Sequence, residues 1–128
     1  MTKEQYNNLS AQLLDASIAV HREMGPGLIE GVYHQCLVYE LRSRGIIVES
    51  IVGIPLIYKG KDLGKQYIAD MIVEKEILIE LKAIDGLLPI HEAQIISYLK
   101  LSGKRLGFLI NFNVPLLKDG FRRFVNNF

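Results

Sequence analysis

The spacing of apolar residues changes at Gly45 of this 128-residue chain, and this change constrains the fold more than any other feature. Before Gly45, apolar residues recur every three or four positions, as in amphipathic helices. One helix is expected from Ser10, as its N-cap, to about Met24, and a second over residues 28–44. Gly45 is expected to end the second helix, and beyond it a period of two predicts strands.

The rest of the chain is predicted to build a sheet and one more helix. The expected elements are strands at 46–52 and 54–58, a polar turn at 59–64, strands at 65–73 and 77–83, a helix at 91–102, and a strand at 106–111. Residues 115–128 stay open between a short helix and an edge strand. Because the third helix is long enough to cross over, the strands on either side of it can be parallel neighbours. We therefore expect an α/β fold, a mixed central sheet flanked by helices, in one domain over residues 1–128.

Composition narrows the function classes. A net charge of +1 excludes a protein that coats nucleic acid by bulk charge, although basic residues gather after residue 95. That basic region is either a solvated face or a surface that meets phosphates. The single cysteine, Cys36, cannot form an internal disulfide, which fits a reducing cytoplasm. The longest uncharged apolar stretch is too short to cross a membrane.

Charged residues stand inside two of the predicted core strands. Asp70 lies within the apolar run 67–73, and Glu80 and Lys82 lie at the end of another. An unpaired buried charge is costly, and a bound divalent cation would offset that cost. A salt bridge between Lys82 and one acid is the alternative. Asp70, inside a wholly apolar strand, favours the metal site.

The metal-site hypothesis depends on side-chain parity. A two-residue connection at Glu74 and Lys75 would place Asp70 opposite Ile79, facing away from Glu80. A three-residue connection, or a bulge, would place Asp70 directly opposite Glu80, with Cβ atoms about 5 Å apart. Two carboxylates at that distance repel each other, and a hard cation with oxygen ligands resolves the conflict. The site therefore requires an odd connection or a bulge.

Two helices carry further candidates. Glu30 stands in the first turn of the second helix and shares a face with Tyr33, although the helix dipole alone would favour an acid there. Gln94 and Tyr98 are one turn apart on the third helix. Core packing is the plainer interpretation of Tyr98, and a solvated or helix–helix hydrogen bond that of Gln94.

Together these residues resemble a known family. The run from Gly27 to Tyr33 matches the signature GxxExxY. Further matches are Tyr67-Ile68-Ala69-Asp70, Ile79-Glu80-Leu81-Lys82-Ala83, His91-Glu92-Ala93-Gln94, Tyr98-Leu99 and Gly107-Phe108-Leu109-Ile110-Asn111-Phe112. The chain resembles the GxxExxY family from His21 to about Arg123. That family is similar to the PD-(D/E)XK nuclease superfamily, in particular its RecB-like and junction-resolvase-like members.

The resemblance implies a restriction-endonuclease-like core with a mixed four-stranded sheet. It also implies the site residues, which are the first-motif acid Asp70, the second-motif pair Glu80 and Lys82, the helix acid Glu30, and the Gln94 and Tyr98 pair of RecB-like members. Ala69 stands where the superfamily's name has proline. Asp70, Glu80 and the Leu81 carbonyl are expected to hold Mg²⁺ or Mn²⁺, with Glu30 bound directly or through water. Lys82 is expected to position the attacking water or to stabilise transition-state charge.

The function implied is metal-dependent hydrolysis of phosphodiester bonds in nucleic acid, with DNA as the expected substrate. A homodimer would supply two sites for cutting both strands. The alternative is a non-catalytic module on the same fold that binds nucleic acid or protein. A metal-dependent hydrolase of another kind is a third interpretation, for which the sequence holds no substrate motif. Fold alone does not decide among them.

Overall fold

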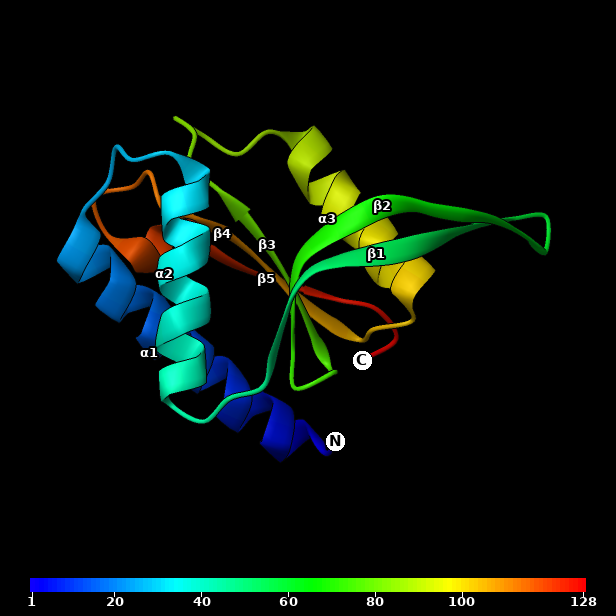
Figure 1. The fold of residues 1–128 in the computed structure, drawn as a ribbon, viewed down its shortest axis with the longest axis horizontal. Helices are drawn as coiled ribbons and strands as arrows, with labels where there is room; N and C mark the ends of the chain where they lie inside the picture. The colour runs from blue at the N-terminus through cyan, green and yellow to red at the C-terminus, as the bar shows by residue number, and fades with distance from the viewer.

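The computed structural model describes all 128 residues and has a five-stranded mixed sheet with helices on both faces (Figure 1). Its elements in chain order are α1 Lys3–Met24, α2 Glu30–Ser43, β1 Val48–Tyr58, β2 Lys61–Val73, β3 Ile77–Lys82, α3 Pro89–Ser102, β4 Leu106–Asn111, the 3₁₀ turn η1 Leu117–Gly120, and β5 Phe121–Val125. The predicted α/β class is confirmed. None of the helices is long and apolar enough to cross a membrane.

The strands lie in the order β1-β2-β3-β4-β5. Only β3 and β4 run parallel, because α3 carries the chain across between them, and the other three pairs are antiparallel. The fifth strand, β5, extends the four-stranded core that the resemblance implied. The parallel pair was predicted and is confirmed.

Two apolar cores hold the layers together. The larger core joins α1 and α2 to one face of the sheet, with Leu13, Leu37 and Ile79 fully buried. The smaller core joins α3 to the sheet through Leu78 and Ile95. The strands β3 and β4, buried at every residue except Lys82, therefore lie between helical layers, as expected for parallel neighbours.

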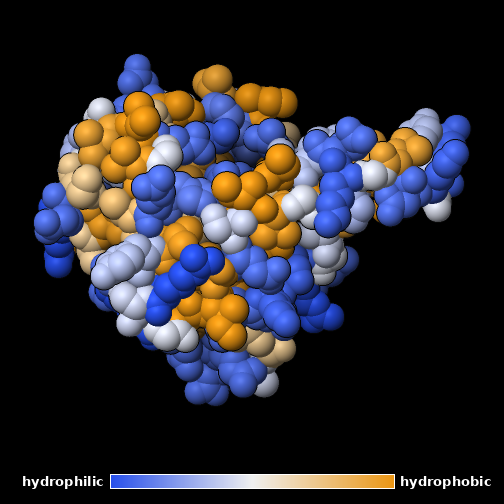
Figure 2. All heavy atoms as spheres, viewed as in Figure 1, coloured by the Kyte–Doolittle hydropathy of each residue, from blue (hydrophilic) through white to orange (hydrophobic).

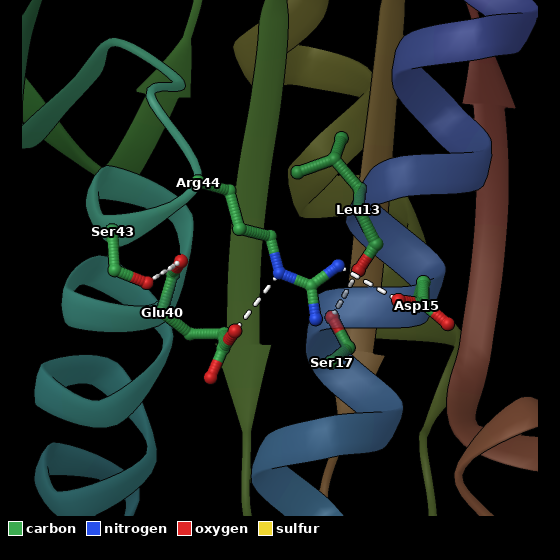
Figure 3. Close-up of polar contacts among 6 residues, drawn as sticks. All are labelled: Leu13, Asp15, Ser17, Glu40, Ser43 and Arg44. Carbon is green, nitrogen blue, oxygen red and sulfur yellow. Dashed lines mark hydrogen bonds and ion pairs between the residues drawn. The ribbon is translucent and has the colours of Figure 1, made fainter.

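Arg44 ties the C-terminal end of α2 to α1 (Figure 3). Its Nη1 lies 2.7 Å from Asp15 Oδ2 on α1, and its Nε lies 2.8 Å from Glu40 Oε2 on α2. Both ion pairs are partly exposed to solvent, which screens them, so they orient the helices more than they stabilise them. Below them, the Ser17 hydroxyl donates to the Leu13 carbonyl at 2.7 Å.

The first helix begins earlier than predicted. Thr2, rather than Ser10, is its N-cap: Thr2 Oγ1 accepts from the Gln5 N–H, and Gln5 Oε1 accepts from the Thr2 N–H. The Ser10 hydroxyl donates to the Tyr6 carbonyl inside the helix. The reciprocal cap at Thr2 satisfies two helix-end donors, which a mid-helix serine cannot do.

The predicted break at Gly53 and the six-residue turn are also wrong. β1 runs unbroken through Gly53, which pairs with Ile68, and the turn consists of Lys59 and Gly60 alone. Both turn residues have positive φ, 51° and 77°, and this pattern matches the twist of a two-residue hairpin. Residues 61–64, predicted as turn, therefore belong to β2.

Candidate active site

The connection between β2 and β3 has three residues, as the metal-site hypothesis required. Val73 pairs with Ile77 and Met71 pairs with Ile79. Continued by one residue, this register sets Asp70 opposite Glu80. The parity condition is therefore met.

The Asp70 side chain is held against β3. Its Oδ2 accepts a hydrogen bond from the Leu81 N–H at 2.7 Å. The backbone pairing of the two strands ends at Met71, so the carboxylate serves as the acceptor for Leu81 where the strands separate. Asp70 is thereby fixed beside the backbone between Glu80 and Lys82.

Glu80 is a buried acid with an unsatisfied oxygen. The residue is 8% exposed, and its Oε1 has no hydrogen-bond partner. Burial, and then the negative charge of Asp70, raise the pKa of Glu80 to about 9, and the positive charge of Lys82 lowers it by a smaller amount. Glu80 therefore holds a proton at neutral pH when no cation is bound.

A divalent cation fits this pair of acids. Removing a partner from a buried carboxyl oxygen is costly, and Glu80 Oε1 stands unpartnered beside a second carboxylate. Hard cations prefer such oxygen donors. No three or more His, Cys, Asp or Glu side chains are arranged as a metal-binding group. The donor set would therefore consist of Asp70 and Glu80 with a backbone carbonyl such as that of Leu81.

Lys82 ends β3 without an ion pair. The half-buried residue lies within 4 Å of no carboxylate, so the salt-bridge alternative is not observed. Its charge still lowers the pKa values of Glu80 and Glu30 relative to burial alone, which places its ammonium in the same region.

Asn111 fixes the chain just after Lys82, a role that the sequence interpretation missed. The buried amide donates through Nδ2 to the Ile84 carbonyl at 2.9 Å. Its Oδ1 accepts from the N–H groups of Ile84 and Asn113, at 3.1 and 3.2 Å. An asparagine at the end of the otherwise apolar strand β4 is the signal that could have indicated this clamp.

Glu30 is exposed at the start of α2. Loss of solvent, and then the negative charge of Asp70, raise the pKa of its carboxyl, so the two acids lie near each other. The sequence placed Glu30 on the same face of α2 as Tyr33, but Tyr33, Leu37 and Leu41 on that face are buried, whereas Glu30 is exposed. Glu30 lies in the first turn of α2, where the helix dipole also favours an acid.

Tyr33 explains the second half of the GxxExxY spacing. Its hydroxyl donates to the Gly25 carbonyl at 2.6 Å and accepts from the Leu28 N–H at 3.1 Å. Its ring stacks on Phe112 with centroids 4.6 Å apart. The tyrosine therefore anchors the loop that delivers Glu30 to the sheet.

Tyr98 belongs to the core and also lies close to the acids. It is 7% exposed, and its ring centroid is 5.4 Å from that of Tyr67. Burial, and then the charge of Glu80, raise the pKa of Tyr98, and the adjacent Gln94 side chain opposes that shift. Gln94 itself is exposed. The two residues thus share one corner of the site.

A cleft of about 470 Å³ opens beside Glu30 and Asp70. Of the predicted site residues, only Glu30 and Asp70 line it. The other lining residues are Gly31, His34, Gln35, Ser50, Ile51 and Ile68. His34 Nε2 lies 2.7 Å from Ser50 Oγ. Sequence reasoning missed both residues of this pair, although His34 follows Glu30 by one helical turn.

The fold and the site together define an α/β protein with a nuclease-like core. A family model described as the PD-(D/E)XK nuclease superfamily matches residues 7–124, and the chain belongs to this superfamily. Comparison with the curated proteins and with the solved structures returned no match.

Proposed function

We propose that this protein is a metal-dependent nuclease that hydrolyses phosphodiester bonds in DNA. Residues 1–128 would form one nuclease-like domain of the GxxExxY type, related to RecB-like members. The observation that carries the proposal is the buried Glu80 carboxyl, unpartnered at Oε1 and set beside Asp70. A buried carboxyl oxygen without a hydrogen-bond partner destabilises the fold, and a bound cation would remove that cost.

Asp70, Glu80 and the Leu81 carbonyl would hold Mg²⁺ or Mn²⁺, and Glu30 would bind it directly or through water. A cation at that point supplies Lewis-acid chemistry, because it lowers the pKa of water and offsets phosphate charge. Glu80 would have to be ionised to hold the cation. The hydrogen bond from Leu81 N–H keeps Asp70 aimed at the same point.

The remaining residues act on the substrate. Lys82, which has no carboxylate partner, donates to a phosphate oxygen or to the attacking water and stabilises the charge that grows in the transition state. Gln94 and Tyr98 orient the nucleic-acid backbone. His34 and Ser50, on the wall of the cleft, contact the same strand of the nucleic acid.

Cleavage of supercoiled, linear, single-stranded and branched DNA with Mg²⁺ and then Mn²⁺ tests the proposal. We expect metal-dependent cutting that falls by about 10²-fold or more in Asp70→Asn and Lys82→Ala. The exposed Lys118→Ala is a control that leaves the site intact. Activity that survives in both site variants would come from a contaminating nuclease, and the proposal would fail.

A non-catalytic binding module is the second candidate. It is favoured by the lack of any preformed group of three metal-binding side chains. Calorimetric titration with Mn²⁺ near neutral pH separates the two candidates. A nuclease binds Mn²⁺ in the wild type and loses that binding in Asp70→Asn, whereas a module shows no heat in either. Sedimentation would show whether a homodimer supplies two sites.

A further inference from the structure

The hairpin of β1 and β2 continues beyond the body of the protein as a narrow arm (Figure 1). Ile54 is the last buried residue on β1, and Ala69 is the first on β2. We name residues 55–68, none of which is buried, the arm. An isolated two-stranded hairpin is marginally stable in water, so an arm of this length is expected to have a partner.

The arm carries an excess of positive charge. It holds Lys59, Lys61 and Lys65 against Asp62 alone, an excess larger than the net charge of +1 of the whole chain. None of the three lysines pairs with a carboxylate within 4 Å. Asp62 Oδ1 instead accepts from the Gly64 N–H at 2.8 Å. Figure 2 shows the arm as a mainly hydrophilic projection with one apolar patch.

Two of these lysines are held by the arm itself. A Cβ built on Gly53 would lie 2.8 Å from Lys65 Cδ, so the Lys65 stem lies across the glycine. Gly53 pairs with Ile68, and so the stem leans toward the base of the arm. Lys59 Nζ lies 5.5 Å from the centroid of the Tyr58 ring. The Lys65 stem therefore lies along the hairpin and leaves its ammonium available to an anion, whereas the Lys59 ammonium lies over an exposed tyrosine ring near the tip of the arm.

The base of the arm is also the wall of the cleft. Ile68, at the end of the arm, lines the cleft together with Asp70, Ser50 and Ile51 from the same two strands. A polyanion lying along the arm would therefore pass directly over Asp70. The basic residues Lys104 and Arg105 are less well placed, because Leu106 pairs with Ile77 at the end of β3 opposite Lys82.

We propose that the arm binds the phosphate backbone of a DNA duplex and positions the duplex over the cleft. This rests on the proposed function for the meaning of the cleft, but it makes a separate claim about binding. The four residues that β1 contributes to the arm, 55–58, reach roughly 13 Å, and a major groove about 12 Å wide admits a two-stranded ribbon. Ile57, Tyr58 and Leu63 are exposed and would meet sugars and base edges.

The test measures DNA binding under conditions that prevent metal-dependent cleavage. A short fluorescein-labelled duplex is titrated in EDTA at several salt concentrations, and anisotropy gives the affinity. Replacing all three arm lysines with Gln should weaken binding by about tenfold or more and reduce the slope of log K against log salt by about 2 to 3. The matched Lys→Arg variant of the same positions should bind like the wild type.

The control replaces Lys3, Lys75 and Lys100 with Gln, three exposed lysines outside the arm. An equal loss in this control, or no loss in the arm variant, overturns the proposal, as does a wild type that binds no duplex. Sedimentation supplies a further check. A dimer that dissociates when the arm lysines are replaced would make the arm a contact between copies, which also overturns it. Normal binding without cleavage would instead count against the proposed nuclease activity.

Discussion

Replacing Glu80 with Gln should change how the stability of the protein depends on pH. The folded-state pKa of Glu80, about 9, lies above the ordinary value of 4.5. Between these values the folded protein holds one proton more than the unfolded chain. The contribution of this proton to the free energy of unfolding is therefore fully present below the lower pKa and is lost as the pH rises through the upper one.

The size of the effect follows from linkage. One extra bound proton lowers the free energy of unfolding by about 1.4 kcal/mol per pH unit. From about pH 6 to about pH 8, the wild type should lose about 3 kcal/mol that Glu80→Gln keeps. The amide has nearly the same shape but cannot ionise, so the packing around the buried residue should change little.

Urea denaturation followed by circular dichroism, in EDTA, measures this difference. Glu49→Gln is the matched control, because Glu49 is exposed on β1 and its replacement leaves the buried acids intact. Other groups titrate in every variant, so the quantity that matters is the difference in slope between wild type and Glu80→Gln. Equal slopes would refute the argument that burial and Asp70 hold a proton on Glu80.

Mn²⁺ at 100 times its Kd should stabilise the wild type by about 2.7 kcal/mol. At a fixed Mn²⁺ concentration the stabilisation should increase with pH, because Glu80 must lose its proton to bind the ion. Equal stabilisation of Asp70→Asn would contradict this. Tyr33→Phe should cost about 1 to 2 kcal/mol in urea denaturation, because the Gly25 carbonyl and the Leu28 N–H lose their partner. Gly120→Ala would drive a Cβ into the Asn111 carbonyl oxygen, and a loss of about 3 kcal/mol or more is expected. Gly31→Ala is its control: with no atom within 4 Å, it should stabilise α2 by about 0.5 to 1 kcal/mol, and a thermal melt compares the two.

Local patterns predicted the elements that depend on local chemistry. The apolar run of β4 and the stop at Gly45 were recoverable, because burial on both faces and a left-handed residue leave direct marks in the sequence. The errors arose where two signals competed. Ser10 looked like an N-cap until the reciprocal pair at Thr2 extended the helix, and Gly53 looked like a break although it leaves room for the stem of Lys65.

The candidate site divides in the same way. Asp70, Glu80 and Lys82 stood out in the sequence because charges rarely occur inside apolar strands. Whether the two acids meet depended on one parity choice, which the three-residue connection decides. His34 and Ser50 come together from a helix and a strand, 16 residues apart, and only their hydrogen bond reveals them.

The sequence was enough to predict the order of the elements, to allow a parallel pairing of the strands on either side of the third helix, and to indicate the residue types that can hold a cation. These follow from periodicity, chain length and charge, which are local quantities. Only the three-dimensional arrangement shows the burial that raises the pKa of Glu80, the hydrogen bond from Leu81 to Asp70, and the reach of the arm beyond the body. Each of these depends on which distant side chains exclude water from a group or leave it exposed, and no local pattern carries that information.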